Sequence, residues 1–265
     1  MSDPRELFKG TVWYYARYRR GYPRAFFDFV IKEFHLDGKG RILDLGCGTG
    51  QIAIPLARYF QEVIALDPDE GMLEESKKQG AAKKVTNVHW QVGKAEDISQ
   101  AMGMFKLATM GASFHWMRQQ VVLEKLYDVI EPSGGIVIVS GNNSFWRDTE
   151  DGQWRAKTKE VIQRHLGKER RAGNSLYVQP EGKFEDMLAH SKFSDIKVWT
   201  HGYQDTWTID DLIGRLYSTS FAAKRLFRDG AKNFEKELRD ELSKLEPSGR
   251  FTEKIKVEAM YAVKN

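Results

Sequence analysis

The chain has 265 residues, a formal net charge of +4, 41% hydrophobic residues and 29% charged residues. This composition is ordinary for a globular protein and excludes a largely disordered or fibrous chain. The mild positive charge permits an anionic ligand but does not argue for nucleic acid, for which a much stronger basic excess is usual, so a nucleic-acid partner is not expected.

The hydropathy of the sequence predicts neither a membrane-spanning segment nor a secretory signal. No apolar run approaches the ~18 residues of a membrane span, and the first ten residues lack the apolar core of a secretory signal. Cys47 is the single cysteine, which excludes an intrachain disulfide or a multi-cysteine metal site. We therefore expect a cytoplasmic protein without a membrane partner.

The N-terminal segment, residues 1–35, is predicted to be helical. It contains the aromatic and basic run "WYYARYRR" (residues 13–20), followed by "RAFFDFVIKEF" (residues 24–34), whose apolar residues fall on one helical stripe. The stretch "RILDLGCGTG" (residues 41–50) follows. Its first half is typical of a strand buried on both faces, and its three glycines permit a tight turn. The run "QIAIPLARYF" then suits a helix in which Pro55 is tolerated only in the first turn.

The glycine turn and two acids predict the ligand. The spacing is G-x-G-x-G, whereas a dinucleotide fold requires G-x-G-x-x-G, and Gln51 occupies the place of the third glycine. Asp44 would repel a pyrophosphate but would pair with an ammonium group. Asp67 ends the next predicted strand, where a carboxylate accepts hydrogen bonds from both hydroxyls of a ribose. A ligand with a ribose, a cationic amino-acid end and no phosphate is S-adenosylmethionine.

The ordered set of motifs from about residue 41 to 141 resembles the core of the class I S-adenosylmethionine-dependent methyltransferases. "DLGCGTG" resembles their first motif, "ALDPDEGML" the second and "VGKAEDI" the third. "FKLATMGASFHWM" resembles strand four and the loop that faces the substrate, and "EPSGGIVIVS" resembles the run into strand five. The N-terminal "YYARYRRGYP" resembles the opening of the small-molecule branch of the family.

Alternating strands and helices predict an α/β fold with a parallel sheet and crossover helices. The resemblance makes this a Rossmann-like, seven-stranded, mostly parallel sheet flanked by helices, with the last strand antiparallel. We expect a single domain over residues 1–265. Its parts are an N-terminal helical lid (1–35), a cofactor-binding core (41–141), a helical insertion after strand five (143–190), and C-terminal strands and helix (195–265). The predicted core strands are 41–45, 62–67, 87–92, 104–110 and 135–140.

The resemblance also implies a cofactor site. The methionine part would lie on Asp44 and the glycine turn, the ribose on Asp67, and the adenine near Pro68 and Met72. Ala95 and Glu96 would contact the adenine edge, although Lys94 replaces the usual aspartate there, so this contact could come from the backbone alone. The expected cofactor-binding residues are Asp44, Gly46, Cys47, Gly48, Gly50, Asp67, Pro68, Met72, Ala95, Glu96 and, from the lid, Tyr14 and Arg19.

The expected acceptor-binding residues are Tyr18, Ser113, Phe114, His115 and Trp116. Methyl transfer from a sulfonium is an in-line displacement, so the protein mainly aligns the reactants and excludes water. His115 follows strand four and is either a general base or only a wall of the pocket. The other histidines show no metal-ligand spacing, so no metal is expected.

These features predict an S-adenosylmethionine-dependent methyltransferase that acts on a small-molecule acceptor and releases S-adenosylhomocysteine. The alternatives are an RNA or protein methyltransferase, or a non-catalytic protein that binds the cofactor. Enzymes that methylate base amines often carry Asn/Asp-Pro-Pro-Tyr/Phe after strand four, whereas this chain has Gly111-Ala112-Ser113-Phe114. The sequence leaves the acceptor and the oligomeric state open.

Overall fold

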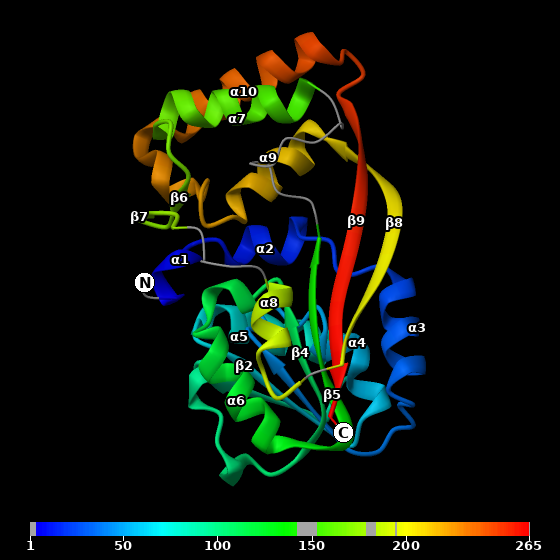
Figure 1. Cartoon of the computed structure of the whole chain (residues 1–265). Coiled ribbons are helices and arrows are strands. Elements are labelled where there is room, and N and C mark those ends of the chain that lie inside the picture. Colours follow the sequence, from blue (N-terminus) through cyan, green and yellow to red (C-terminus); the bar gives the residue numbers. More distant parts are fainter. Residues whose placement is uncertain (1–3, 142–152, 179–183, 194, 265) are drawn as a thin grey trace. The chain divides into compact units, whose positions relative to one another are not determined.

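A computed structural model describes residues 4–141, 153–178, 184–193 and 195–264 (Figure 1). The chain forms two compact units, each assembled from three segments. The helical unit contains Met1–Arg20, Gly141–Gln179 and Gly202–Lys256. The sheet unit contains Gly21–Ser140, Pro180–His201 and Val257–Asn265. The expected lid, residues 1–35, is divided between them, and a single domain over the whole chain stays a prediction.

The sheet has seven strands in the order β3-β2-β1-β4-β5-β9-β8. Its first five strands pair in parallel, and the last strand in the chain, β9, is antiparallel. This confirms the predicted Rossmann-like sheet. The strands are β1 (Arg41–Leu45), β2 (Glu62–Asp67), β3 (Val88–Val92), β4 (Phe105–Gly111), β5 (Ile130–Gly141), β8 (Ile196–Thr208) and β9 (Arg250–Val263).

Burial explains why the central strands form where the sequence predicts them. Leu43 and Leu45 in β1 and Leu107 in β4 are fully buried, because helices cover a parallel sheet on both faces. Strands β1 and β2 match their predicted bounds residue for residue. The helices in this unit are α3 (Arg24–Glu33), α4 (Ala53–Leu56), α5 (Glu70–Ala82), α6 (Gln119–Val129) and α8 (Phe184–Ala189).

The connection from β1 is shorter than the sequence suggests. Helix α4 has four residues, with Pro55 in its first turn as expected, and it passes directly into a 3-10 turn, η1 (Ala57–Tyr59). Asp44 lies level with Ala65 of β2 and Thr109 of β4. The carboxyl ends of these parallel strands therefore meet at one edge of the sheet, which is the edge where such folds bind ligands.

The helical unit differs most from the sequence-based expectations. Its elements are α1 (Pro4–Leu7), α2 (Val12–Tyr18), α7 (Gln153–Leu166), a short hairpin of β6 (Arg171–Ala172) and β7 (Ser175–Leu176), α9 (Ile209–Tyr217), a 3-10 segment η5 (Lys224–Gly230), and α10 (Ala231–Leu245). The hairpin lies where the sequence predicts only helix. Residues 143–152 and 179–183 of that predicted insertion lie outside the described residues.

The helix expected within residues 195–265 is α9, for which the run "IDDLIGRLYSTSFAAKRL" (residues 209–226) predicts a longer helix than the one observed, which ends at Tyr217. The Ser218 hydroxyl donates to the Arg215 carbonyl (2.5 Å) and the Thr219 hydroxyl donates to the Leu216 carbonyl (2.7 Å). Serine and threonine hydroxyls compete in this way for backbone carbonyls and favour helix ends. The sequence analysis also missed helix α10, although its buried residues Ala231, Phe234, Leu238 and Leu242 follow helical spacing.

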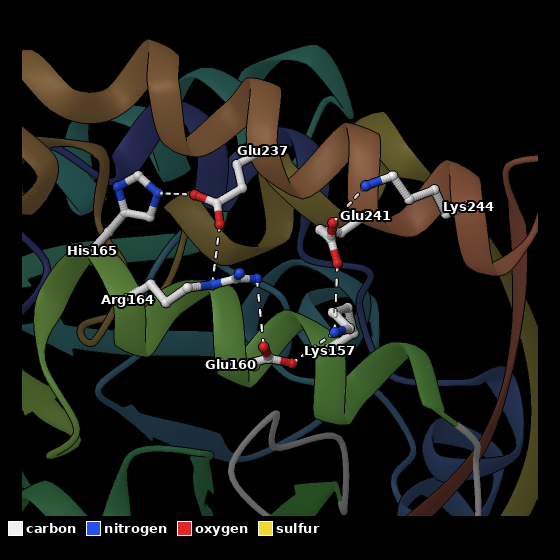
Figure 2. Close-up of polar contacts among 7 residues, drawn as sticks. All are labelled: Lys157, Glu160, Arg164, His165, Glu237, Glu241 and Lys244. Carbon is white, nitrogen blue, oxygen red and sulfur yellow. Dashed lines mark hydrogen bonds and ion pairs between the residues drawn. The ribbon is translucent and has the colours of Figure 1, made fainter.

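Helices α7 and α10 lie side by side, joined by a row of charged side chains (Figure 2). Lys157 of α7 contacts Glu241 of α10 (3.5 Å), and Arg164 contacts Glu237 (3.0 Å). His165 Nε2 lies 2.6 Å from the other Glu237 oxygen. Partly exposed ion pairs add little stability individually, so this row mainly fixes which faces of the two helices meet.

A buried ion cluster connects three elements of the same unit. The Glu253 carboxylate of β9 is fully buried and accepts hydrogen bonds from Arg215 of α9, at 2.6 and 3.3 Å. Arg155 of α7 also donates to Glu253. Breaking such a cluster is costly because the remaining charges stay buried. The cluster therefore holds α7, α9 and β9 in one arrangement.

Helix α2 is attached to α9 at a glycine. A Cβ at Gly214 would overlap the Tyr18 ring. We predict that Gly214→Ala displaces α2, lowers the free energy of unfolding by about 1–3 kcal/mol through overpacking, and speeds amide exchange over Val12–Tyr18. Gly202→Ala is the matched control, because a Cβ there has no atom within 4 Å. Unchanged exchange in Gly214→Ala would contradict this account of how α2 is held.

Candidate active site

The glycine turn after β1 is a rigid, hydrogen-bonded structure. Gly46, Gly48 and Gly50 have φ of 66°, 54° and 85°, a region that favours glycine. The Gly46 and Cys47 amides both donate to the Leu66 carbonyl, at 2.8 and 3.0 Å. The turn is therefore tied to the end of β2, beside Asp67.

The protein's own side chains occupy much of the space that the glycines leave. A Cβ at Gly46 would lie 2.5 Å from Ser113 Cβ. A Cβ at Gly50 would lie 2.8 Å from Ile54 Cδ1 and 3.1 Å from Trp90 Cη2. The sequence analysis attributed the glycines to a ligand, but two of them are also required by intramolecular packing.

Asp67, at the end of β2, has a carboxylate that is buried and already ordered. Its Oδ2 accepts the Gly48 N–H and its Oδ1 accepts the Asp69 N–H, each at 2.9 Å. Burial raises the pKa of Asp67 to about 6 despite these two hydrogen bonds. Each carboxylate oxygen retains a second lone pair, so Asp67 has the capacity to accept two hydroxyl hydrogen bonds from a ribose.

Asp44, in β1, is also buried and fixed by two donors. The Ala53 N–H donates to Oδ2 (3.1 Å) and the Thr109 hydroxyl donates to Oδ1 (2.7 Å). Burial raises its pKa to about 7. The sequence analysis did not single out Thr109, although a polar residue inside the apolar strand "FKLATMG" is a signal that could have revealed it. Thr109 orients Asp44 from the neighbouring strand β4.

Cys47 lies within the turn and is 5% exposed. Burial raises the pKa of its thiol, and the nearby Asp67 and Asp44 raise it further. A thiol with a raised pKa is a poor nucleophile, and the expected contact of Cys47 with the cofactor stays a prediction.

The residues expected near the adenine lie after β2 and β3. Met72 of α5 and Ala95 are buried, and Pro68 is half-buried. The Glu96 carboxylate accepts the Arg118 N–H (2.6 Å) just before α6, and Lys125 of α6 donates to the Glu96 carbonyl. These contacts fix the loop after β3 against α6. Contact of Glu96 with the adenine edge stays a prediction.

The loop after β4 turns back over the glycine turn. Ala112 has a φ of 52°, a strained conformation for a residue with a Cβ. The Ser113 hydroxyl donates to the Leu45 carbonyl (2.7 Å), and the buried Phe114 ring meets Phe184 with ring centroids 5.3 Å apart.

His115 and Trp116 follow in a 3-10 turn, η4 (Phe114–Trp116), with half-buried rings whose centroids are 4.6 Å apart. Ser113 and Phe114 thus anchor the loop to the core, and the two rings after them are partly exposed. Acceptor binding by these four residues stays a prediction.

Three predicted site residues belong to the helical unit and contact its other elements. The Tyr14 ring lies against Tyr217, with centroids 5.1 Å apart, and the Tyr18 ring lies over Gly214. Arg19 Nε donates to the Ser218 hydroxyl (2.8 Å). Their expected roles as lid residues toward cofactor and acceptor stay predictions.

Among the described residues, no group of histidine, cysteine, aspartate and glutamate side chains is arranged to hold a metal ion. No helix within the same ranges is long and apolar enough to cross a membrane.

Comparisons with known proteins agree with this geometry. A family model described as a methyltransferase domain matches residues 42–134. An uncharacterized methyltransferase-like protein of Schizosaccharomyces pombe is 27% identical over 254 residues, which cover 95% of this chain and 91% of that protein. The ubiquinone/menaquinone biosynthesis C-methyltransferase of Zymomonas mobilis is 27% identical over 48% of this chain and 52% of its own length. The solved structure of the YcgJ protein from Bacillus subtilis has the same fold, with a TM-score of 0.56 and 19% identity over 92% of this chain and 99% of that one.

A glycine turn between two buried acids, at the carboxyl edge of a seven-stranded sheet, defines the class as Rossmann-like methyltransferases. Residues 42–134 carry a methyltransferase domain. The protein is an S-adenosylmethionine-dependent methyltransferase, and S-adenosylmethionine is its cofactor. The residues present fit this cofactor, because Asp67 is a buried, ordered carboxylate whose two oxygens each accept one backbone hydrogen bond and each have the capacity to accept another.

The assignment of Asp67 to the ribose is tested by substitution. We predict that Asp67→Ala weakens S-adenosylhomocysteine binding by about 1–3 kcal/mol, because hydrogen bonds to a charged group are lost. Asp67→Asn keeps one acceptor oxygen and should lose less affinity. Isothermal titration calorimetry measures both, with circular dichroism as the check of folding. Unchanged affinity in folded Asp67→Ala would contradict the ribose role.

The raised pKa values of Asp67 (about 6) and Asp44 (about 7) predict a pH dependence. Without ligand, these carboxyls bind protons more tightly in the folded than in the unfolded chain, so their contribution to stability falls as pH rises from about 4 to about 7. A cationic ligand with donor hydroxyls favours the ionised carboxylates. Binding should therefore release protons and become up to about tenfold tighter per pH unit for each proton released, between about pH 5.5 and 7.

Calorimetry in two buffers of different ionisation enthalpy measures the protons released on binding. Asp67→Asn should flatten the lower part of the affinity profile, whereas Asp37→Asn, at an exposed carboxyl with a lowered pKa, should leave it unchanged. A flat profile in the wild-type protein would show that neither buried acid is coupled to the ligand.

Proposed function

We propose that the protein transfers a methyl group from S-adenosylmethionine to a small-molecule acceptor, with the donor bound at the carboxyl ends of β1, β2 and β4. The observation that carries this proposal is the pair of buried carboxylates, Asp44 and Asp67, ordered on either side of the glycine turn. Their charge suits the ammonium and ribose of the donor, and their burial keeps water from competing for the same hydrogen bonds.

The loop after β4 supports a small acceptor. Gly111, Ala112 and Ser113 are small and uncharged, and the half-buried His115 and Trp116 follow them. This arrangement favours an acceptor of mixed polar and apolar character over a charged polymer. The relative from Zymomonas mobilis is named for quinone biosynthesis, which also supports a small acceptor. The oxygen, nitrogen or carbon atom that receives the methyl group stays open.

In this mechanism the cofactor supplies an activated methyl group on a positively charged sulfonium. The glycine turn gives the donor a close, rigid backbone surface, and Asp67 orients the ribose. Asp44 provides a negative charge beside the turn, and Thr109 orients its carboxylate. The loop after β4 encloses the acceptor and excludes water, so that the nucleophile is aligned with the methyl group. We propose that His115, half-buried in the turn after β4, either holds the acceptor or takes its proton through a ring nitrogen.

A turnover screen tests the proposed function. Purified protein with S-adenosylmethionine is assayed for S-adenosylhomocysteine in the presence of small carboxylic acids, phenols and amines, with total RNA and a protein mixture as separate arms. Turnover with a small molecule is expected. Turnover only with RNA or protein would favour those alternatives, and binding without turnover in every arm would favour a non-catalytic binder.

The role of His115 is tested once an acceptor is found. We predict that His115→Gln lowers kcat by about 10²-fold, the lower range for loss of a general base, without changing cofactor affinity. The loss should shrink as pH rises, because the acceptor then ionises unaided. A His115→Gln enzyme with normal kcat at every pH would leave His115 as part of the pocket wall.

A further inference from the structure

Tyr22, which was not among the expected site residues, has its hydroxyl oxygen beside the last residue of β4, Gly111. Tyr22 belongs to the sheet unit and precedes Pro23, the residue that caps helix α3. Its ring is half-buried and lies against the fully buried Phe26 ring, with centroids 5.1 Å apart. Helix α3 therefore fixes where the phenol ring points.

The Tyr22 hydroxyl is directed at the end of β4. A Cβ at Gly111, the last residue of β4, would lie 2.8 Å from the Tyr22 hydroxyl oxygen and 2.6 Å from Ile52 Cδ1. Ile52 follows the glycine turn and caps α4. The hydroxyl thus occupies the space that a side chain at position 111 would fill, next to the residue that closes the turn.

Strand pairing relates this hydroxyl to the donor site. Thr109 of β4 pairs with Asp44 of β1. Gly111 is two residues further along β4, so it lies near the start of the glycine turn that follows β1. Ser113 confirms the closeness of these two strand ends, because its hydroxyl donates to the Leu45 carbonyl. The Tyr22 oxygen is therefore close to the backbone on which the methionine part of the donor is proposed to lie.

The chemistry of a phenol suits the charged end of that donor. S-adenosylmethionine carries a positive charge on sulfur, whereas S-adenosylhomocysteine carries neither this charge nor the methyl group. A neutral phenol oxygen attracts a cation through its lone pairs and is a far weaker nucleophile than a thiolate. The carboxylates Asp44 and Asp67 are already bonded to the Ala53 and Gly48 amides and are assigned to other parts of the donor.

We propose that Tyr22 is a binding residue of the donor site, whose hydroxyl oxygen faces the sulfonium and distinguishes the methylated donor from the demethylated product. This inference rests on the proposed function, which places the donor on the glycine turn. The proposal also gives Gly111 a role, because any side chain at this position would displace the Tyr22 hydroxyl.

The test is the ratio of two affinities, measured by calorimetry without any acceptor. Tyr22→Phe keeps the ring on Phe26 and removes only the oxygen. We expect it to weaken S-adenosylmethionine binding about two- to tenfold, the range for one lost hydrogen-bond-like contact, and to leave S-adenosylhomocysteine binding nearly unchanged. Sinefungin, which carries an ammonium group in place of the sulfonium, should lose affinity with S-adenosylmethionine.

Tyr59→Phe is the matched control. Tyr59 is a half-buried tyrosine of the same unit in η1, before the start of β2, and therefore at the opposite edge of the sheet. It should leave both affinities unchanged. Equal loss of both affinities in Tyr22→Phe, or no loss of either, would overturn the inference while wild-type binding stands. Failure of the wild-type protein to bind either compound would overturn the proposed function and this inference together.

Discussion

The hydrogen bonds that the buried Asp67 carboxylate accepts from Gly48 and Asp69 are the constraint on which the site depends. One residue at the end of β2 orders both the glycine turn after β1 and the entry to α5. Burying this carboxylate costs free energy, as its raised pKa records. Under the proposed ribose role of Asp67, a ligand with donor hydroxyls and positive charge would offset that cost on binding. The hydrogen bonds that build the turn in the free protein would then also prepare it for the cofactor.

The carboxyl end of β4 is joined to this constraint by contacts between strands. Thr109 donates to Asp44, and Ser113 donates to the Leu45 carbonyl. Gly111 leaves room for the Tyr22 hydroxyl. The strained Ala112 lies between these contacts. The proposed donor and acceptor sides of the candidate site thus share one set of hydrogen bonds. A substitution on one side should therefore shift the positions of residues on the other.

The helical unit has its own framework, in which charge has a different role. The buried Glu253 holds two arginines, and the row of ion pairs between α7 and α10 selects the faces that meet (Figure 2). The aromatic and basic helix α2 is attached to α9 through Tyr18 and Gly214. The first part of the expected lid segment therefore packs against residues that lie about 200 positions further along the chain.

The sequence by itself determined the local features: β1 and β2 to the residue, the glycine turn, the acids at the strand ends and the parallel order of the core. These follow from runs of apolar residues and from backbone conformations that only glycine adopts readily. Helix α10 was also available from its spacing. Only the tertiary structure decided the partners: Thr109 for Asp44, Arg118 for Glu96, and Tyr22 for Gly111. Each pair joins residues that are far apart in the sequence. Whether the two meet depends on how distant segments pack, and the periodicity of apolar residues does not predict that packing.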